Sequence, residues 1–599
     1  MCGIVSIFAY NDPSGVYHED LRQIRDQMAH RGPDGSGEWY SPNNRVGLGH
    51  RRLAIIDLSE RGDQPMKTED GNLVITFSGE IYNYKNLRVE LERKGYRFHS
   101  QSDTEVLLHL YTEKGVDMLN ALRGMFAFAI WDNKKKGLFI ARDPFGIKPL
   151  YYADNGKTFY LASQVKALLK TARMDTRPEA AGHVGFFLWG HVPDPYTFYR
   201  GIRSLAAGSC MWVDSMGNKE TRTYCSIPEI LSDSNRSDSP MSSEEMKLIL
   251  RTALLDTVEY HLIADVPVGI FLSSGMDSTT LVALASEINQ SKINTITMGF
   301  REYIDTVNDE TPLATLTADR YGTTHRTIWV SKKDFEEDFQ HLIQSMDQPT
   351  TDGVNSYFVS KTAQKAGLKV ALSGLGGDEL FGSYSSFSQI PKIVNRLGPF
   401  NDFPFLGKGF RIVSYPFLKH MTSPKYAGLF EYGGSYSGAY FLRRGMFMPW
   451  ELPQLLDGEM VREGWRELQT IVRLEETISK IENPYRKISA FEMCWYMRNQ
   501  LLRDTDWAGM AHSIEVRTPL VDLELLRNVA PFLGGKSSPG KTDMASTPLN
   551  PLPHEVTERR KTGFSIPTAQ WIFEDHKELR ERGLRGWAKF VYNWFTRNP

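Results

Sequence analysis

The chain has 599 residues, of which 41% are hydrophobic and 24% are charged, and its formal net charge is −2. This length predicts two or more domains, and the composition is that of an ordinary soluble globular protein. Because the charge is nearly balanced, we expect neither nucleic acid nor an anionic membrane as a partner.

Cysteine content and apolar runs indicate a cytoplasmic setting. The four cysteines, Cys2, Cys210, Cys225 and Cys494, are scattered, match no zinc-ligand spacing and form no dense disulfide framework. The sequence has no run of about 18 apolar residues and no signal peptide. We therefore expect a cytoplasmic protein that nothing anchors or exports.

The first half of the chain has the pattern of a β-rich domain. Short apolar runs bounded by Gly, Asn and Asp-Pro predict strands of an all-β or layered α+β core. These runs cover residues 73–77, 125–131, 138–141 and 159–162. Helical patterns are fewer, and the clearest cover residues 20–28 and 104–114.

A Ser/Asp-rich run at residues 232–243, SDSNRSDSPMSS, is interpreted as a linker to a second half that has a different pattern of apolar residues. There, strands are predicted at 268–272, 293–300 and 368–372, helices at 279–288 and 310–320, and a tight loop at 273–278. Strand, loop and helix in succession predict a parallel sheet with crossover helices. Beyond Ala490 the pattern is mostly helical, whereas residues 385–480 carry no motif.

Cys2 directly follows Met1. If the initiator Met is removed, Cys2 carries both a thiol and a free α-amine, and an α-amine with a reference pKa of about 8 can serve as base for that thiol. A cysteine at position two is also compatible with an ordinary small residue. The surrounding motifs therefore decide between the two interpretations.

Six sequence blocks occur in order from the N-terminus. They are MCGIVSIF, HRGPDGSG (30–37), GHRRLAIIDL (49–58), SGEIYN (78–83), SDTE (102–105) and ARDPFGIKPLYY (141–152). Together they resemble the glutaminase domain of class II glutamine amidotransferases. The resemblance implies an N-terminal-nucleophile fold of β-sheets stacked between helices, in which Cys2 attacks the glutamine side-chain amide to form a thioester.

The resemblance also implies roles for single residues. Arg52 would pair with the α-carboxylate of glutamine through its guanidinium fork, and Glu80 and Asp103 would hold its ammonium. Gly79 would donate its backbone N–H to the oxyanion. Ser78 stands where the family usually has Asn as the second oxyanion donor, and a Ser hydroxyl is shorter and freer to rotate. We therefore expect either a slower glutaminase or a water or neighbouring group that supplies the second donor.

The loop at residues 273–278, SSGMDS, lies between a predicted strand and a predicted helix. Such a loop directs backbone N–H groups and a helix N-terminus at one point, which suits an anion, and Asp277 can help to hold Mg²⁺. It resembles the Ser-Gly-Gly-X-Asp-Ser pyrophosphate signature of ATP pyrophosphatases, with Ser274 in place of the second-position Gly. The implied ATP-binding residues are Leu272, Ser273, Ser274, Gly275, Asp277, Ser278 and Met298.

Three later blocks resemble the asparagine synthetase signature. They are SGLGGDELFGSY from Ser373, MAHSIEVRTPLVD (510–522) and RRKTGFSIP (559–567). The resemblance places Ser373 and Gly374 at the AMP site and gives Asp378 a part in metal binding. It also implies that Lys561 reaches the phosphates during adenylation and that Glu515 lies near the acyl-acceptor pocket.

The combined resemblance predicts residues 1–210 as the glutaminase domain, 211–243 as a connector and 244–599 as an ATP-binding synthetase domain. The predicted enzyme hydrolyses glutamine and passes the ammonia to an aspartyl-adenylate, giving asparagine, AMP and pyrophosphate, with ATP and Mg²⁺ as cofactors. By analogy with the family we expect an enclosed passage for ammonia and a homodimer.

Leu375 leaves the acceptor open. Well-known asparagine synthetases have an active-site Glu at this position, and Leu can neither accept a proton nor pair with an ammonium ion. Three explanations are open. Another carboxylate does the work of that Glu, the position simply varies among true asparagine synthetases, or the activated acid is a sugar uronate or natural-product acid. Two further alternatives are a β-lactam-forming synthetase, disfavoured by the retained glutamine-site residues, and a catalytically silent nucleotide-binding regulator, disfavoured by Cys2, Asp277 and Lys561.

Overall fold

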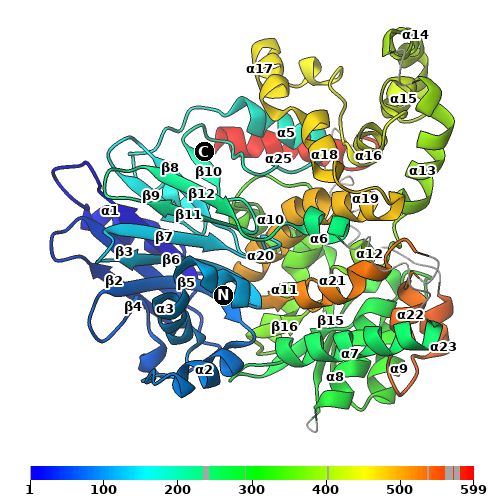
Figure 1. Cartoon of the computed structure of the whole chain (residues 1–599). Helices are drawn as coiled ribbons and strands as arrows, with labels where there is room; N and C mark the ends of the chain where they lie inside the picture. The colour runs from blue at the N-terminus through cyan, green and yellow to red at the C-terminus, as the bar shows by residue number, and fades with distance from the viewer. Residues whose placement is uncertain are drawn as a thin grey trace.

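The computed structural model describes residues 2–233, 242–289, 292–400, 404–535, 538–559, 571 and 581–598. Figure 1 shows two stacked β-sheets in the N-terminal part, drawn in blue and cyan, beside a third sheet covered by helices. The two parts make extensive contact with each other.

The N-terminal part contains two six-stranded antiparallel sheets in the described residues. In strand order the first sheet comprises β10 (Ile202–Ser204), β8 (Tyr151–Asp154), β9 (Phe159–Ala162), β1 (Gly3–Phe8), β3 (Val46–Arg52) and β2 (Gly35–Tyr40). The second comprises β12 (Lys219–Thr223), β11 (Ser209–Val213), β7 (Gly137–Arg142), β6 (Gly124–Asp132), β5 (Leu73–Ile81) and β4 (Met66–Lys67). The strands predicted from the four apolar runs are confirmed.

Side-chain alternation along β1 explains the layers. Ile4 and Phe8 face the second sheet and pack in the core between the sheets, whereas Val5 and Ile7 point the opposite way, toward α1 (His18–Gln27). On the far face of the second sheet, α3 (Asp103–Lys114) packs on β5, with α2 (Tyr84–Arg93) beside it. The order helix, sheet, sheet, helix confirms the fold predicted for this half.

The C-terminal part is built on a parallel sheet of five strands among the described residues. Their order is β15 (Thr324–Val330), β14 (Asn294–Phe300), β13 (Val268–Phe271), β16 (Val370–Leu372) and β17 (Glu515–Arg517). The chain starts at β13, moves outward to β15 and then returns to the other side of β13. The strand order therefore reverses between β13 and β16, and in such sheets ligands bind at the carboxyl ends of the strands on either side of the reversal.

Helices make up most of the remaining chain. Those between or beside the strands are α4 (Val165–Leu168), α5 (Ala180–Trp189), α6 (Ile227–Asp233), α7 (Ser243–His261), α8 (Met276–Ile288), α9 (Thr311–Arg320), α10 (Lys332–Ser345), α11 (Val354–Lys365) and α12 (Gly377–Leu380). No helix in the described ranges is both long enough and apolar enough to cross a bilayer.

The region without motifs is helical, as is most of the chain beyond Ala490. Its helices are α13 (Ser386–Leu397), α14 (Pro404–Met421), α15 (Leu429–Tyr432), α16 (Tyr436–Arg444), α17 (Gly458–Leu468), α18 (Thr470–Ile478), α19 (Pro484–Phe491), a π-helix (Glu492–Leu502), α20 (Arg503–Met510), α21 (Leu523–Val529), α22 (Lys541–Ala545), α23 (His554–Glu558) and α25 (Arg585–Arg597). Among the described residues beyond Ala490, the short strand β17 is the one β-strand in the predicted helical pattern.

Two predicted boundaries are corrected. Helix α8 begins at Met276, not at residue 279, because Gly275 adopts the extended N-cap conformation and Asp277 favours the positively polarised first turn. The predicted linker at 232–243 overlaps helices at both ends, since α6 ends at Asp233 and Ser242 caps α7 in a reciprocal capping box with Glu245. Residues 234–241 lie outside the described residues.

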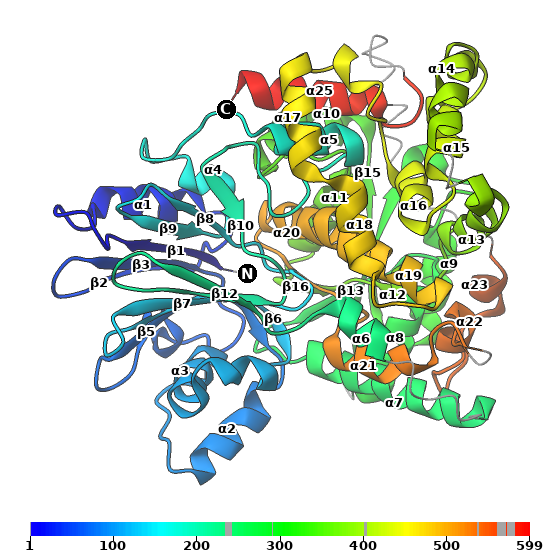
Figure 2. The ribbon, with the colours of Figure 1, turned by 45° about the horizontal axis from the view of Figure 1, so that its top comes forward.

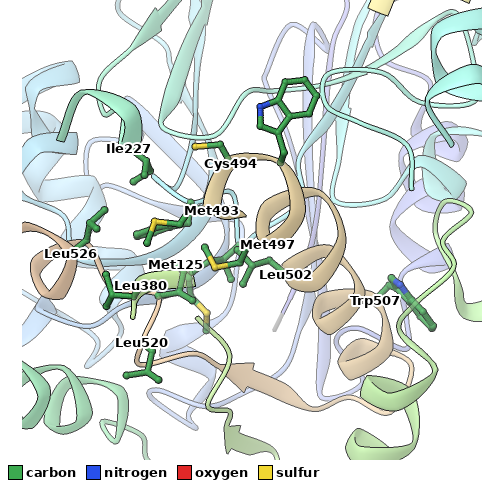
Figure 3. Packing of buried hydrophobic residues seen from close by; sticks show 14 of the residues in the cluster. Met125, Ile227, Leu380, Met493, Cys494, Met497, Leu502, Trp507, Leu520 and Leu526 are labelled. Atoms are coloured by element: carbon green, nitrogen blue, oxygen red, sulfur yellow. The ribbon is translucent and has the colours of Figure 1, made fainter. Parts of the chain in front are cut away.

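An apolar core continues across the two parts. Figure 3 shows Met125 from β6 close to Met493, Met497 and Leu502 of the π-helix. Leu520, which follows β17, belongs to the same cluster. The N-terminal sheets and the helices of the C-terminal part are therefore packed on each other through buried side chains.

Two guanidinium–carboxylate pairs cross the same boundary. Arg31 donates to both oxygens of Asp506 on α20, at 2.7 and 3.1 Å, and neither side chain is appreciably exposed. Arg123 pairs likewise with Asp522, the N-cap of α21, at 2.9 and 3.0 Å. Bidentate geometry of this kind compensates part of the cost of taking both charges out of water.

We expect Asp506→Ala to lower the free energy of unfolding by about 3–5 kcal/mol, because the buried Arg31 charge loses its partner. Urea unfolding followed by tryptophan fluorescence measures the change. The matched control is Glu337→Ala, which breaks an exposed pair with Lys333 and should cost less than about 1 kcal/mol. Equal, small losses in both variants would contradict the assignment of the Arg31 pair as a stabilising link.

Candidate active site

Cys2 lies where β1, β3 and β5 meet. Its Sγ is 3.9 Å from the carbonyl oxygen of Leu53, and its own carbonyl accepts hydrogen bonds from Arg31 Nε at 3.1 Å and from Ser78 Oγ at 2.8 Å. Burial raises the pKa of the Cys2 thiol above its ordinary value. The backbone of the candidate nucleophile is thus fixed from two sides, and its thiol needs a base to ionise.

Strand β5 places Glu80 beside Cys2, and Asp103, at the start of α3, lies near Glu80. Gly79 has a φ of +149°, and a Cβ there would lie 2.0 Å from the Met125 carbonyl, so the bend in β5 requires glycine. Burial, together with the charge of Glu515, raises the pKa of Glu80 well above its ordinary value. Burial also raises the pKa of Asp103 to about 7, although its Oδ2 accepts a hydrogen bond from Ile81 N–H at 3.0 Å.

Arg52 is fixed at the end of β3. Its guanidinium donates to the carbonyl oxygens of Ser59, at 2.8 Å, and Asp57, and pairs with Asp63 at 2.7 Å. The loop after β3 therefore orients the fork before any substrate arrives. The structure brings Ser78 and Glu80 to Cys2, and Asp103 lies near Glu80. The role of Arg52 in binding glutamine stays a prediction.

A cation from the synthetase half faces these carboxylates. Arg517, fully buried on β17, is 3.5 Å from Glu80 and donates to Glu515 at 2.7 Å. The resemblance placed Glu515 near the acceptor pocket. In the structure it lies in the carboxylate cluster beside Cys2, and the neighbouring Arg517 keeps its pKa low despite burial, which acts in the opposite direction.

Backbone atoms connect Arg517 to the second predicted site. The N–H of Ser373, which begins the loop after β16, donates to the carbonyl oxygen of Arg517 at 2.8 Å. One residue therefore has its side chain at the candidate glutamine site and its backbone at a nucleotide loop. No sequence motif indicated this double role.

The loops after β13 and β16 line two adjoining cavities at the reversal in strand order. A cavity of about 290 Å³ and a cavity of about 640 Å³ share several lining residues. All nine residues predicted to bind ATP line one of these cavities or both: Leu272, Ser273, Ser274, Gly275, Asp277, Ser278, Met298, Ser373 and Gly374. A Cβ at Gly374 would lie 2.9 Å from the Asp277 side chain, so glycine permits the close approach of the loops.

Hydrogen bonds within the first loop order its donors. Ser278 Oγ receives the Ser273 N–H at 3.1 Å and lies 2.9 Å from Ser273 Oγ, while the Gly275 N–H donates to Ser273 Oγ at 3.1 Å. Ser274 keeps a negative φ and hydrogen-bonds the Glu310 carboxylate, so Ser is accommodated where the signature has Gly.

Lys541 joins the two predicted metal ligands. Its ammonium group, at the start of α22, pairs with both Asp277 and Asp378. Burial lowers the pKa of Lys541, but the two carboxylates raise it more, so the net shift is upward and the charge is retained. Lys541 was not predicted from the sequence, because a single lysine after Gly540 carries no recognisable pattern.

Leu375 lines both cavities, and other carboxyl groups share the larger one. Asp352 and Asp504 lie on its wall, and burial raises the pKa of both, that of Asp504 to about 8. Asp504 accepts hydrogen bonds from Thr350 at 2.9 Å and from Trp507 at 2.8 Å. The cavity thus contains acidic groups despite Leu375. Lys561 lies outside the described residues.

Comparison with known proteins follows the same division of the chain. The family profile of a glutamine amidotransferase domain matches residues 1–225, and the profile of asparagine synthase matches residues 249–597. A glutamine-hydrolysing asparagine synthetase 1 from Bacillus subtilis is 32% identical over 96% of this chain and 89% of its own length. A putative glutamine-hydrolysing asparagine synthetase from Mycobacterium tuberculosis strain H37Rv is 32% identical over 96% of this chain and 88% of its own.

A more distant relative has a different name. The amidase chry2 of Gibberella zeae is 30% identical over 65% of this chain and 60% of its own length.

The fold and the comparisons place the chain in a class of two-part enzymes, in which a glutamine amidotransferase domain precedes an ATP-dependent synthase domain. Within that class, the chain belongs to the glutamine-hydrolysing asparagine synthetase family, a family of ATP-using ligases.

Proposed function

We propose that this protein is a glutamine-dependent asparagine synthetase whose glutaminase domain extends through β12, beyond the boundary predicted at residue 210, and whose synthetase domain covers residues 244–599. The observation that carries the proposal is Arg517, which touches the Glu80 carboxylate with its side chain and the loop of Ser373 with its backbone. Two sites sharing one buried residue suit a reaction in which one site consumes the product of the other.

In the glutaminase step, Cys2 Sγ attacks the side-chain amide carbon of glutamine. The thiol proton passes to the α-amine that removal of Met1 exposes, and the Gly79 N–H stabilises the oxyanion. Ammonia leaves with that proton, and water then cleaves the thioester to give glutamate. Arg52, Glu80 and Asp103 orient glutamine through its α-carboxylate and ammonium.

In the synthetase step, the acceptor carboxylate attacks the α-phosphate of ATP and pyrophosphate leaves. Ammonia then attacks the acyl carbon of the adenylate and AMP leaves, giving the amide. The loops of Ser273 and Ser373 hold the phosphates with ordered N–H and hydroxyl donors. Lys541 contributes a positive charge at the point where the two aspartates meet.

The donors at this point fit Mg²⁺. Asp277 and Asp378 come from different loops yet both reach one cation, Lys541 Nζ, and carboxylate oxygens together with phosphates are the ligands that Mg²⁺ prefers. When bound there, Mg²⁺ neutralises phosphate charge. Within the described residues, no group of three or more His, Cys, Asp or Glu side chains forms a metal cage.

The test is pyrophosphate release with ATP, Mg²⁺ and glutamine, comparing L-aspartate with other carboxylates, in the wild type and in Cys2→Ala. We expect aspartate-dependent asparagine formation, with glutamine use lost and ammonia use retained in Cys2→Ala. Turnover with a uronate or another acid in place of aspartate would move the acceptor, which is the alternative that Leu375 favours. Failure with every acid and no glutamate release would refute the proposal.

Lys541→Ala should lower kcat/KM for ATP in pyrophosphate release about 10- to 100-fold, because an ion-paired contact to a charged site is lost. Glutamine hydrolysis measured without ATP should be unchanged. Lys333→Ala, an exposed lysine on α10, is the matched control. An unchanged kcat/KM in Lys541→Ala would remove this residue from the nucleotide site.

We expect the KM for glutamine to rise by about tenfold per unit as pH falls below 7. Asp103 has a pKa of about 7, so acid neutralises the carboxylate that attracts the substrate ammonium. Asp103→Asn should have a high KM that varies little between pH 6 and 8, whereas the exposed control Asp70→Asn should retain the wild-type profile. A pH slope that survives in Asp103→Asn would assign the titration to another group.

A further inference from the structure

Helix α14 presents its apolar side chains to solvent. Seven large apolar residues of this helix are between 40% and 82% exposed: Phe405, Leu406, Phe410, Ile412, Val413, Phe417 and Met421. Figures 1 and 2 both place α14 at the outer edge of the molecule, beyond α13 and α16. Soluble monomers rarely expose so many large apolar residues on one element, and such a face usually marks an interaction surface.

Contacts on the opposite face fix this orientation. A Cβ at Gly407 would lie 2.7 Å from the Cα of Glu431, so α14 and α15 approach closely there. Arg411 Nε donates to Glu431 at 2.6 Å, and its guanidinium carbon lies 4.8 Å from the centre of the Trp450 ring. Phe410 also packs on α15, with its ring centre 4.7 Å from that of Phe430. The polar anchor therefore points inward and the more exposed apolar residues point outward, which is the reverse of an ordinary surface helix.

The segment that contains α13 and α14 has a positive formal charge in a chain that is slightly negative overall, and one of its basic residues, Arg411, is paired with Glu431 of α15. Residues 386–421, which contain α13 and α14, include five basic residues, Lys392, Arg396, Lys408, Arg411 and Lys419, against the single acidic residue Asp402. Lys392, Arg396 and Lys408 are exposed. Total composition conceals this local excess, which is why the sequence led us to expect no membrane partner.

We propose that α14 is an interfacial helix that binds this protein to the surface of an anionic phospholipid bilayer. Its 18 residues span about 27 Å, and an apolar stripe of that length accompanied by basic residues can lie in the plane of the headgroups. The basic residues attract anionic lipids, while the aromatic and aliphatic side chains enter the acyl boundary. A single projecting helix gives a convex ridge, which a bilayer accepts without a complementary groove.

The proposal is tested by co-flotation of the full-length protein with phosphatidylcholine vesicles, with and without phosphatidylglycerol. We expect binding to the anionic vesicles, its loss in Val413→Glu and Phe417→Glu, and a weakening of about fivefold in Lys408→Gln. The matched control is Met216→Glu, at a position that is 74% exposed in the turn between β11 and β12, and it should bind as the wild type does. All variants should keep their pyrophosphate-release activity, since α14 contributes no residue to the two nucleotide cavities.

Three results would overturn the proposal. One is no flotation with either vesicle, and another is equal flotation with both, which would exclude an electrostatic contribution. The third is a wild-type dimer in analytical ultracentrifugation that Phe417→Glu converts to a monomer, because a second copy of the chain would then cover α14.

Discussion

The buried guanidinium of Arg517 holds together a group of charges that could not be buried separately. Glu80 and Glu515 both lie near it, and without its positive charge two carboxylates would share a water-free site. Burial still raises the pKa of Glu80, so the compensation is partial. The geometry beside Cys2 therefore depends on a strand, β17, that belongs to the synthetase sheet.

Arg31 reinforces this dependence from the other side of Cys2. Its Nε holds the Cys2 carbonyl, while its two terminal nitrogens bind Asp506 on α20. The nucleophile is thus oriented by a side chain whose own charge is balanced across the domain boundary. The geometry of both candidate sites therefore depends on contacts between the two halves of the chain.

Local patterns predicted the parts of the fold that depend on local interactions. The strand and helix of the loop at Ser273 follow from hydrophobic runs and turn residues, and Cys2 was recognisable from its neighbours along the chain. Strand β17 was missed because Glu515 and Arg517, two of its three residues, are charged and become buried only by pairing across the structure. Lys541 was missed for a similar reason, since its two partners are distant in sequence.

The orientation of helix α14 could not be predicted from the sequence. No element was predicted here, and a periodic apolar pattern by itself would assign the apolar face to the interior. The contacts of Gly407 and Arg411 with Glu431 show instead that much of this face is turned outward. The direction of an amphipathic stripe is set by a tertiary contact of a few atoms.

The ion pairs across the boundary also bear on how such proteins arise and can be engineered. If the gene were cut between the halves, the glutaminase piece would expose Arg31 and Arg123 without their carboxylates, and the synthetase piece would expose Arg517 without Glu80. Each fragment would also expose the apolar surface around Met125 and the π-helix. Domain exchange between relatives therefore requires both sides of this boundary to be transferred together.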